Sequence, residues 1–381
     1  MIREQFSAPS LLPFIPNSAA APLLLDIETT GLSSARDRIY LIGCAWETGQ
    51  EGDLCRYELR QFFARNTDEE AAMLRAFLEF FPRFSSVVHF NGDRFDLPFI
   101  KKRALLLGLG EHPGYQALCN AESIDLCRII KPYRSALGLP DGTQRSLEKL
   151  LNTGRTDEKN GGDLIKVYHG YERTRDAHAR VMLLLHNADD VRGLPALSAA
   201  APLLSFINEV RAGSCTISLL SASGHDYRTL AGDDCTEAYL SFSLSSPVPT
   251  ALHHHQEGLY LQIEGSTGRL RAPLISCELK HFFRDYKNYD YLPAEDRAVH
   301  HSVSQFVDRS HRVQANAANC YVRKEGRFLP FPQLPKKYSL PDDLPVFRES
   351  CDSPSCFMEF RPEKEKDMGR YLSHVLKMLF S

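Results

Sequence analysis

The sequence predicts an α/β domain, built on a mixed sheet flanked by helices, and a smaller α+β domain after it. Two observations lead to this fold class. Up to residue 205, apolar runs of strand length alternate with segments of helical periodicity, whereas beyond residue 214 short strand-like runs are separated by Gly- and Ser-rich turns. The chain has 381 residues, enough for two domains with separate cores. We therefore expect an N-terminal extension over 1–21, the α/β domain over 22–205 and an accessory domain over 214–381.

The first domain is expected to begin with three strands and to continue with alternating helices and strands. Its strands are predicted by apolar or alternating runs at 23–28, 38–46, 54–63, 87–90 and 123–127. A first helix begins at Thr67 with an N-cap and an acidic first turn, and further helices follow over 95–107 and 173–197. Three adjacent strands, a crossover helix and another strand are the order of an α/β sheet.

The second half contains no motif that assigns it a role. We expect strands at 215–220, 238–244, 258–263 and 269–271, helices at 278–286 and 294–307, a hairpin over 320–328 and a final amphipathic helix over 364–380. The three consecutive histidines at 253–255 favour an exposed polar loop over a metal site.

Composition excludes some classes of protein and leaves others open. The formal net charge is −3, so nucleic acid would have to be held by local cations or by metal rather than by a general positive field. No apolar run approaches 18 residues, which predicts that no segment spans a membrane. The first residues do not have the pattern of a signal peptide. The ten cysteines lack a Cys-x-x-Cys pair, so we expect reduced thiols and a cytoplasmic protein.

Two carboxylates follow the first buried strand. Asp26 and Glu28 come after three leucines and lie two residues apart, which places both on one side of a strand, and Gly31 then turns the chain. Paired acids at the end of an apolar strand are costly unless a cation offsets their repulsion, and a divalent metal is the usual partner. A solvated strand end is the alternative, and the acids further along the chain favour the metal.

A third carboxylate, Asp96, follows the fourth strand within the segment 91–99. Gly92 permits a sharp turn, and Asp93 or Asn91 can cap the helix that comes next. Acids in a first helical turn are also favoured by the helix dipole alone. Beside the Asp26 pair, however, a third acid at the same sheet end is what a metal site requires.

The last candidates lie in the helical stretch 173–197. His186 and Asp190 are four residues apart and therefore share a helical face. A purely structural histidine is the alternative there. Asp125, at the end of the 123–127 strand, is either a support for the site or an ordinary strand-end acid.

Three segments in order resemble the motifs of the DEDD 3′–5′ exonucleases: DIETTG at 26–31, NGxxFDxPF at 91–99 and HxxxD at 186–190. The closer resemblance is to the YprB-like branch of the RNase H-like superfamily, over roughly residues 20–200. It implies an RNase H-like mixed sheet and 3′–5′ exonuclease activity. The sequence departs from the pattern in one place, because the spacing of the third motif is that of the tyrosine-type subgroup while His186 stands where Tyr is usual.

The chemistry of phosphodiester hydrolysis suits these residues. Two divalent ions supply a nucleophilic hydroxide and stabilise charge on the leaving oxygen. Oxygen ligands favour Mg²⁺ or Mn²⁺, with Asp26 holding both ions and Glu28, Asp96 and Asp190 completing their shells. His186, whose unperturbed pKa is about 6.5, could orient or deprotonate the attacking water.

The expected partner is nucleic acid, either DNA or RNA, bound at a single-stranded end. Asn91 of the second motif is a candidate contact, and the densest cluster of cations, at 309–337, adds Arg323, Lys324 and Arg327. The alternative to a nucleic-acid contact is that these cations are only solvated and that the aromatic residues at 282–291 fill a core. A non-catalytic nucleic-acid-binding or assembly protein that retains the fold is the rival function.

Overall fold

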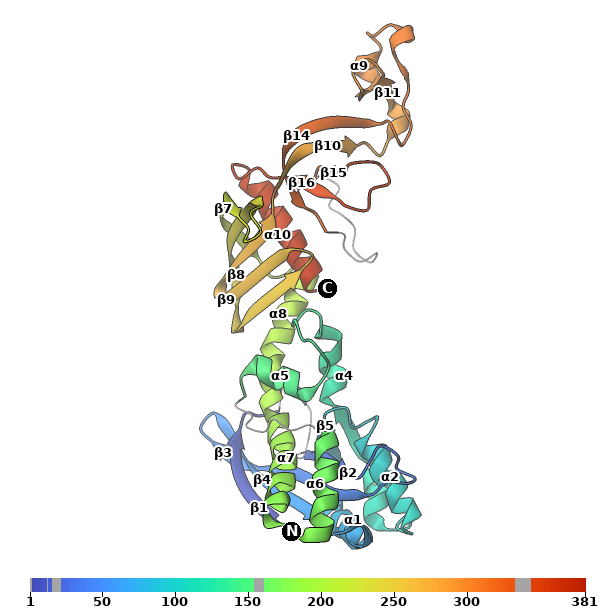
Figure 1. Cartoon of the computed structure of the whole chain (residues 1–381), viewed down its shortest axis with the longest axis vertical. Coiled ribbons are helices and arrows are strands. Elements are labelled where there is room, and N and C mark those ends of the chain that lie inside the picture. Colours follow the sequence, from blue (N-terminus) through green and yellow to red (C-terminus); the bar gives the residue numbers. More distant parts are fainter. Residues whose placement is uncertain (1, 12, 16–21, 154–160, 333–343) are drawn as a thin grey trace. The chain divides into compact units, whose positions relative to one another are not determined.

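The computed structural model describes residues 2–11, 13–15, 22–153, 161–332 and 344–381 (Figure 1). The chain divides into two compact units. The first comprises Met1–Arg134 and Leu139–Leu204, and the second comprises Ser135–Gly138 and Ser205–Ser381. All ten cysteines are free.

A six-stranded mixed sheet forms the centre of the first unit, with the strand order β1-β4-β3-β2-β5-β6. The strands are β1 (Ile2–Ala8), β2 (Leu23–Thr29), β3 (Ile39–Glu51), β4 (Leu54–Phe63), β5 (Ser86–His89) and β6 (Glu122–Asp125). In this order β1, β4, β3 and β2 each run antiparallel to the next, whereas β5 runs parallel to both β2 and β6. The predicted mixed sheet is confirmed.

Helices cover both faces of this sheet. They are α1 (Glu70–Phe80), α2 (Asp96–Leu106), α3 (Pro113–Asn120), α4 (Leu126–Ile130), α5 (Gln144–Leu151), α6 (Gly161–Thr174) and α7 (Ala177–Ala196), with α8 (Ala201–Ala212) beginning at the end of the unit. One apolar cluster joins Leu25 of β2 to residues of α1, α2 and α3. The next residue, Asp26, contacts α7. Since successive strand residues point to opposite faces, α1 and α7 lie on opposite sides of the sheet.

The N-terminus differs from the prediction of an extension over 1–21. Strand β1 pairs antiparallel with β4 from Ile2↔Gln61 to Ala8↔Cys55, and the ring of Phe6 stacks on that of Tyr57 at 5.2 Å. The physical reason is that β4 would otherwise expose an unpaired edge, and the prolines that break pairing come only after Ala8. Residues 12 and 16–21 of the predicted extension lie outside the described residues.

The second unit is rich in strands, as expected for a smaller α+β domain. Its three sheets are β7 (Ile217–Arg228), β8 (Asp234–Gln256) and β9 (Leu259–Pro273); β10 (Ile275–Phe282), β14 (Tyr321–Pro330), β16 (Phe357–Glu359) and β15 (Val346–Phe347); and β12 (Arg297–His300), β11 (Tyr289–Leu292) and β13 (Val313–Gln314). Its described α-helices are most of α8, together with α9 (His301–Ser304) and α10 (Glu365–Leu379). The final amphipathic helix is thus confirmed.

Several local predictions in this unit are wrong. Residues 278–286 belong largely to β10, and 294–307 contains β12 and only the short α9. The predicted hairpin over 320–328 is part of the single strand β14, which pairs with β10 from Ile275↔Phe328 to Phe282↔Tyr321. The histidines at 253–255 lie in β8 rather than in a loop. In each case pairing with a partner strand overrides local periodicity, and for β10 and β14 that partner lies far away in the sequence.

One helical stretch, Ala177–Ala212, has the length and composition of a membrane span. However, 61% of its most apolar window is buried inside the protein, as in the core helix of a globular domain. The absence of a membrane-spanning segment therefore stays a prediction.

Candidate metal centre

The candidate site begins at strand β2, whose alternation separates apolar from acidic side chains. Leu23, Leu25 and Ile27 enter the apolar cluster below the sheet. Asp26 and Glu28 lie between them in sequence and therefore face the opposite side, toward α7. The strand thus delivers both carboxylates to one face.

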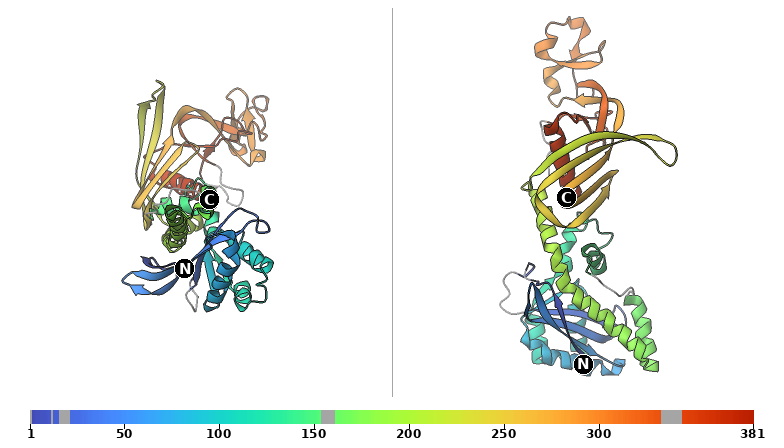
Figure 2. Two further views of the ribbon diagram at one scale, coloured as in Figure 1. Left: turned by 60° about the horizontal axis from the view of Figure 1, so that its bottom comes forward. Right: turned by 90° about the vertical axis from the view of Figure 1, so that its left-hand side faces the viewer.

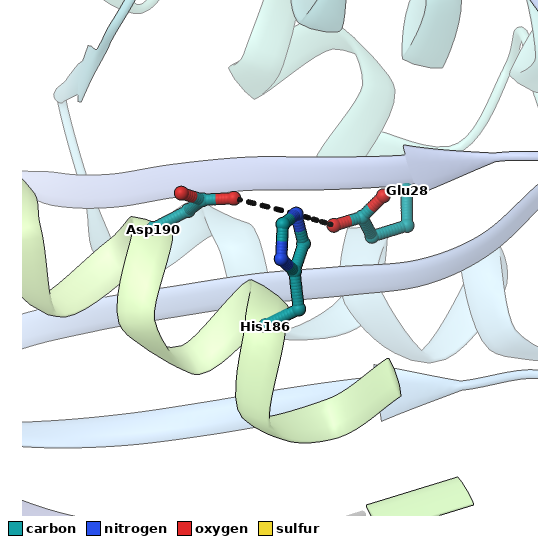
Figure 3. Close-up of side chains that lie close together, drawn as sticks. All are labelled: Glu28, His186 and Asp190. Atoms are coloured by element: carbon teal, nitrogen blue, oxygen red, sulfur yellow. Dashed lines mark ion pairs between the residues drawn. The ribbon is translucent and has the colours of Figure 1, made fainter. Parts of the chain in front are cut away.

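Helix α7 supplies the residues that meet them. Its N-cap is Asp176, whose carboxylate accepts hydrogen bonds from the backbone N–H groups of His178 and Ala179. His186 and Asp190 follow one turn apart on the helix. His186 Nε2 lies 3.3 Å from Asp190 Oδ2 and 3.6 Å from Glu28 Oε1 (Figure 3). One ligand atom from each of these three residues lies within 4.8 Å of the others.

A tight turn after β5 brings Asp96 to the same place. Asn91 has a left-handed backbone (φ 65°), which Asn tolerates better than most residues. A Cβ atom at Gly92 would lie 2.6 Å from the His89 ring and 3.0 Å from Asp96 Oδ2, so the close approach requires glycine. Asp96 Oδ1 then accepts a hydrogen bond of 3.1 Å from the backbone N–H of Ile27, the residue between Asp26 and Glu28.

The acids are buried close enough to repel one another. Burial raises the pKa of Asp26 well above its usual value, and the charges of Asp190, Asp96 and Glu28 raise it further. Burial also raises the pKa of Asp96 to about 7, although the Ile27 N–H lowers it; Asp125 and Asp190 add to the rise. Without a cation, this cluster holds like charges in a poorly solvated place.

An amide relay holds Asp26, and the sequence interpretation missed it. Asn187 Nδ2 donates to Asp26 Oδ2 at 2.9 Å, and Gln61 Nε2 of β4 donates to Asn187 Oδ1 at 2.9 Å and to the Leu184 carbonyl at 2.8 Å. Both amides are almost fully buried. A Cβ atom at Gly43 would lie 2.0 Å from Asn187 Oδ1, so the relay requires glycine there. The available signal was Asn187 itself, next to His186 in the third motif.

A second amide secures the far end of the site. Gln144 Nε2 of α5 donates to the backbone carbonyl of Asp190 at 2.8 Å and to Glu148 Oε1 at 2.7 Å. Glu148 is buried, and a Cβ atom at Gly193 would lie 1.9 Å from its Oε1. Glu148 belongs to the SLEK segment at 146–149 that precedes the third motif. The segment therefore supports the helix turn that carries Asp190.

Asp125 and Asn91 have structural contacts here. Asp125 Oδ1 accepts hydrogen bonds from the backbone N–H groups of Asn91 at 2.8 Å and Cys127 at 3.0 Å, and so caps α4. This contact connects the turn before Asp96 to the end of β6. The predicted nucleic-acid role of Asn91 concerns its side chain and stays a prediction.

The predicted cations of the second unit lie on β14 and face acids. Arg323 forms ion pairs with Glu278 and Asp296, the first at 3.1 Å. Lys324 Nζ lies 3.5 Å from Glu359 Oε1, and the Arg327 guanidinium lies over the Phe360 ring. These pairs neutralise part of the positive charge that the prediction relied on. Residues 333–343, which include Lys336 and Lys337, lie outside the described residues.

The aromatic residues at 282–291 contribute to a small core. Phe283 stacks on Tyr289 at 4.5 Å, and Phe283, Tyr286, Tyr289 and Tyr291 pack against a buried cluster that contains Cys320. The alternative that these aromatics fill a core therefore fits their packing.

The residues at the end of β2 fit a divalent metal. Carboxylate oxygens are what Mg²⁺ and Mn²⁺ prefer, and a cation would offset both the burial and the neighbouring negative charges that raise the pKa values of Asp26 and Asp96. Asp26, Glu28, Asp96 and Asp190 would hold it. Tyr40 belongs to the surroundings of these acids. Burial raises the pKa of its hydroxyl, and the nearby charge of Glu28 raises it further.

Comparisons with known proteins concern mainly the first unit. Residues 23–201 match the family model described as RNase_H superfamily. Over 95 residues the chain is 34% identical to DNA polymerase 1 of Aeropyrum pernix, a match that covers 25% of this chain and 10% of the polymerase.

Two solved structures of E. coli Exonuclease I are also similar. The complex with a dT13 oligonucleotide has 14% identity and a TM-score of 0.29, over 59% of this chain and 55% of that chain. The complex with a 5cy-dA13 oligonucleotide has 12% identity and a TM-score of 0.33, over 94% and 70%. The chain thus spans a tenth of the polymerase and about half of the exonuclease in the first complex. The family match, together with the mixed sheet and the helices on both of its faces, identifies the N-terminal unit as an RNase H-like domain.

Proposed function

We propose that this protein is a metal-dependent nuclease that hydrolyses phosphodiester bonds of DNA or RNA as a 3′–5′ exonuclease. We also propose that it belongs to the YprB-like branch of the DEDD exonucleases and acts in the cytoplasm. The observation that carries the proposal is the convergence of Glu28, His186 and Asp190 within 4.8 Å, beside the half-buried Asp26 and the buried Asp96. The RNase H superfamily match supports it independently.

The residues have distinct tasks in this proposal. Asp26, Glu28, Asp96 and Asp190 would bind two Mg²⁺ or Mn²⁺ ions. When bound, such ions supply a nucleophilic hydroxide and stabilise charge on the leaving oxygen.

His186 is the candidate general base. Its Nε2 faces Asp190 and Glu28, so it would hold a proton at the position where the attacking water must lose one. The Asn187–Gln61 relay keeps the Asp26 carboxylate in place, and Gln144 keeps the α7 turn in place. The nucleic-acid contacts proposed for Asn91, Arg323, Lys324 and Arg327 are secondary, since the last three already contact protein groups.

The test uses 5′- and 3′-end-labelled single- and double-stranded DNA and RNA, incubated with Mn²⁺ or with a chelator. We expect Mn²⁺-dependent shortening from the 3′ end, with single strands cut fastest. Asp189→Asn is the matched control for Asp190→Asn, because Asp189 pairs with Arg192 on the same helix. Binding without cleavage of any substrate would favour the non-catalytic alternative.

A further inference from the structure

The second unit contains a long antiparallel pair that curls on itself. Strands β8 and β9 are joined by a tight turn in which Glu257 (φ 52°) and Gly258 (φ 79°) are both left-handed. A straight strand rises about 3.3 Å per residue, so Tyr260 and Arg271 would lie more than about 30 Å apart along β9. Instead, the Arg271 guanidinium lies 4.7 Å from the centre of the Tyr260 ring. The strands therefore bend back until the turn approaches the other end of β9 (Figure 2).

The position of Gly258 agrees with this bend. A Cβ atom there would lie 3.7 Å from the side chain of Pro273, the last residue of β9. Register shifts in the pairing of β8 with β9, between Ser243 and Val248 and between Val248 and Leu252, accompany the bend. Such irregularities are what bend a strand pair.

The curl leaves one face apolar and buried and the other exposed. Leu259, Leu261 and Ile263 of β9 are buried, whereas Tyr260 and Gln262 between them are exposed. Farther along, Leu270 is buried and its neighbours Arg269 and Arg271 are exposed or half-buried. The exposed face thus collects polar, aromatic and cationic side chains from both ends of the strand.

These side chains line a cavity of about 500 Å³. Those that matter for binding are Tyr239, His253, His255, Tyr260, Arg269 and Arg271. Cross-strand register explains their proximity, since Tyr239 pairs with Arg271, His253 with Gln262 and His255 with Tyr260.

The cavity contains a stacked aromatic pair. The rings of His255 and Tyr260 are stacked at 4.1 Å with an interplanar angle of 15°, and Tyr260 remains 42% exposed. Since His255 covers one face of the Tyr260 ring and the Arg271 guanidinium lies over the ring as well, a further planar group would stack on Tyr260 by displacing Arg271.

Positive charge lies beside this aromatic pair. Arg269 has no carboxylate within 4 Å among the residues that the structure describes, whereas Arg271 also contacts Glu237 at 3.7 Å, and Glu237 accepts a hydrogen bond from Tyr239. One acid thus opposes two guanidinium groups. The combination suits a ligand that is planar in one part and anionic in another.

A metal is a poorer occupant of the cavity. The three consecutive histidines alternate in direction along β8, and His254 Nε2 is bound to the Ser135 carbonyl at 2.9 Å. His253 and His255 therefore do not converge with His254 on one ion.

Building on the proposed nuclease function, we propose that this cavity binds single-stranded nucleic acid, with a base stacked on Tyr260 and phosphates held by Arg269 and Arg271. A single strand offers free base faces, whereas the bases of a duplex already stack on one another. The site is separate from the acids of β2 and contributes binding rather than chemistry.

The test measures binding of a fluorescent dT16 or U16 oligonucleotide to the full chain in EDTA, which prevents cleavage. Tyr260→Ala should raise Kd about tenfold, the loss expected for one stacked base. Arg269→Ala combined with Arg271→Ala should lower the slope of the salt dependence by about 1.4, because two phosphate contacts to a single strand are lost. The matched controls are Tyr227→Ala and Arg228→Ala on β7, where Tyr227 is 44% exposed.

Crosslinking with 5-iodouracil in the same oligonucleotide locates the strand. We expect crosslinks at 253–271, lost in Tyr260→Ala. Unchanged Kd and salt dependence in both variants, with crosslinks confined to 23–201, would overturn the proposal. A duplex of the same length that competes as well as the single strand would also overturn it.

A separate measurement distinguishes this failure from that of the proposed function. Hydrolysis of the p-nitrophenyl ester of thymidine 5′-phosphate with Mn²⁺ reports the acids of β2 alone, because the ester is too short to need a second site. Tyr260→Ala should hydrolyse it at the wild-type rate. An inactive wild type that still crosslinks at 253–271 would sink the nuclease but keep the binding site.

Discussion

The acidic cluster of the first unit and the cavity lined by β8 and β9 in the second unit (the curled pocket) differ in the burial and the sign of their charges. In the cluster, the half-buried Asp26 and the buried Asp96 carry the same sign, and both pKa values are raised by burial and by the charge of Asp190. In the pocket, Arg269, Arg271 and Glu237 remain at least partly exposed and carry mixed signs. Buried like charges need a compact counter-ion, whereas exposed cations beside an aromatic ring suit an extended polyanion. In the proposed function, the first is the site of hydrolysis and the second is a surface that binds the substrate.

The largest expected effect comes from removing one acid of the cluster. Asp190→Asn should lower Mn²⁺-dependent nuclease activity by about 10³-fold or more, because the site loses a ligand and transition-state charge goes unbalanced. Calorimetry should show weaker Mn²⁺ binding. Asp189→Asn, one residue away and paired with Arg192, should retain both properties. Equal losses in the two variants would mean that the helix, not the acid, was damaged.

Replacing the histidine should separate chemistry from metal binding. His186→Ala should lower turnover by about 10²-fold, the size of a lost general base, while Mn²⁺ affinity remains largely intact. His186→Tyr should retain some activity, because position and spacing then match the tyrosine-type pattern. Rates like the wild type in His186→Ala would show that His186 only packs between Glu28 and Asp190.

Breaking the amide relay should weaken metal binding without removing a ligand. Asn187→Ala deprives Asp26 of its 2.9 Å hydrogen bond, and Mn²⁺ affinity should fall by about 10-fold. Isothermal titration provides the measurement. Asn208→Ala, an exposed position on α8, is the control. An unchanged Mn²⁺ affinity in Asn187→Ala would show that other contacts hold the Asp26 carboxylate in place.

The raised pKa of Asp96 predicts a stability effect with a defined sign. Its pKa lies near 4 in the unfolded chain and about 7 in the folded one, so the folded state binds more protons between these values. The metal-free protein should therefore lose stability as pH rises from about 4 to 7. Asp96→Asn should remove this loss and stabilise the metal-free protein at pH 8 by about 1–3 kcal/mol.

Thermal unfolding in EDTA at pH 5 and pH 8 tests this sign. Asp68→Asn, at an exposed position in the 3-10 turn before α1, should change neither value. With saturating Mn²⁺ the order should reverse, because only the wild type gains the full binding energy of the ion. A wild type more stable at pH 8 than Asp96→Asn in EDTA would contradict the like-charge account.

The smallest effect is expected on β14. Replacing Arg323, Lys324 and Arg327 together with Ala should change the salt dependence of oligonucleotide binding by less than the Arg269/Arg271 pair, since Arg323 and Lys324 already face acids. The same fluorescence assay compares the two sets. A larger change in salt dependence for the β14 set would indicate that β14, rather than the curled pocket, holds the oligonucleotide.

Periodicity predicted the parts of the site that lie within one element. Two-residue spacing put Asp26 and Glu28 on one strand face, and four-residue spacing put His186 and Asp190 on one helix face. Nothing local could place Gln61 beside Asn187, because their contact depends on the packing of α7 across the sheet. The β10–β14 pairing was missed for the same reason, and helical periodicity in 278–286 was misleading without knowledge of its partner strand.

The glycine beneath the amide relay has a consequence for sequence variation. Position 43 and position 187 share one small space, where a Cβ atom on the strand would meet the Asn187 amide at 2.0 Å. Among related sequences, a larger residue at 43 should therefore be accompanied by a smaller one at 187, and the two positions should change together. Lineages that keep Asn187 should also keep Gly43, although glycine in the middle of a strand weakens it. Such covariation of positions 43 and 187 would show, without any measurement of activity, in which related sequences the Asn187 side chain holds Asp26.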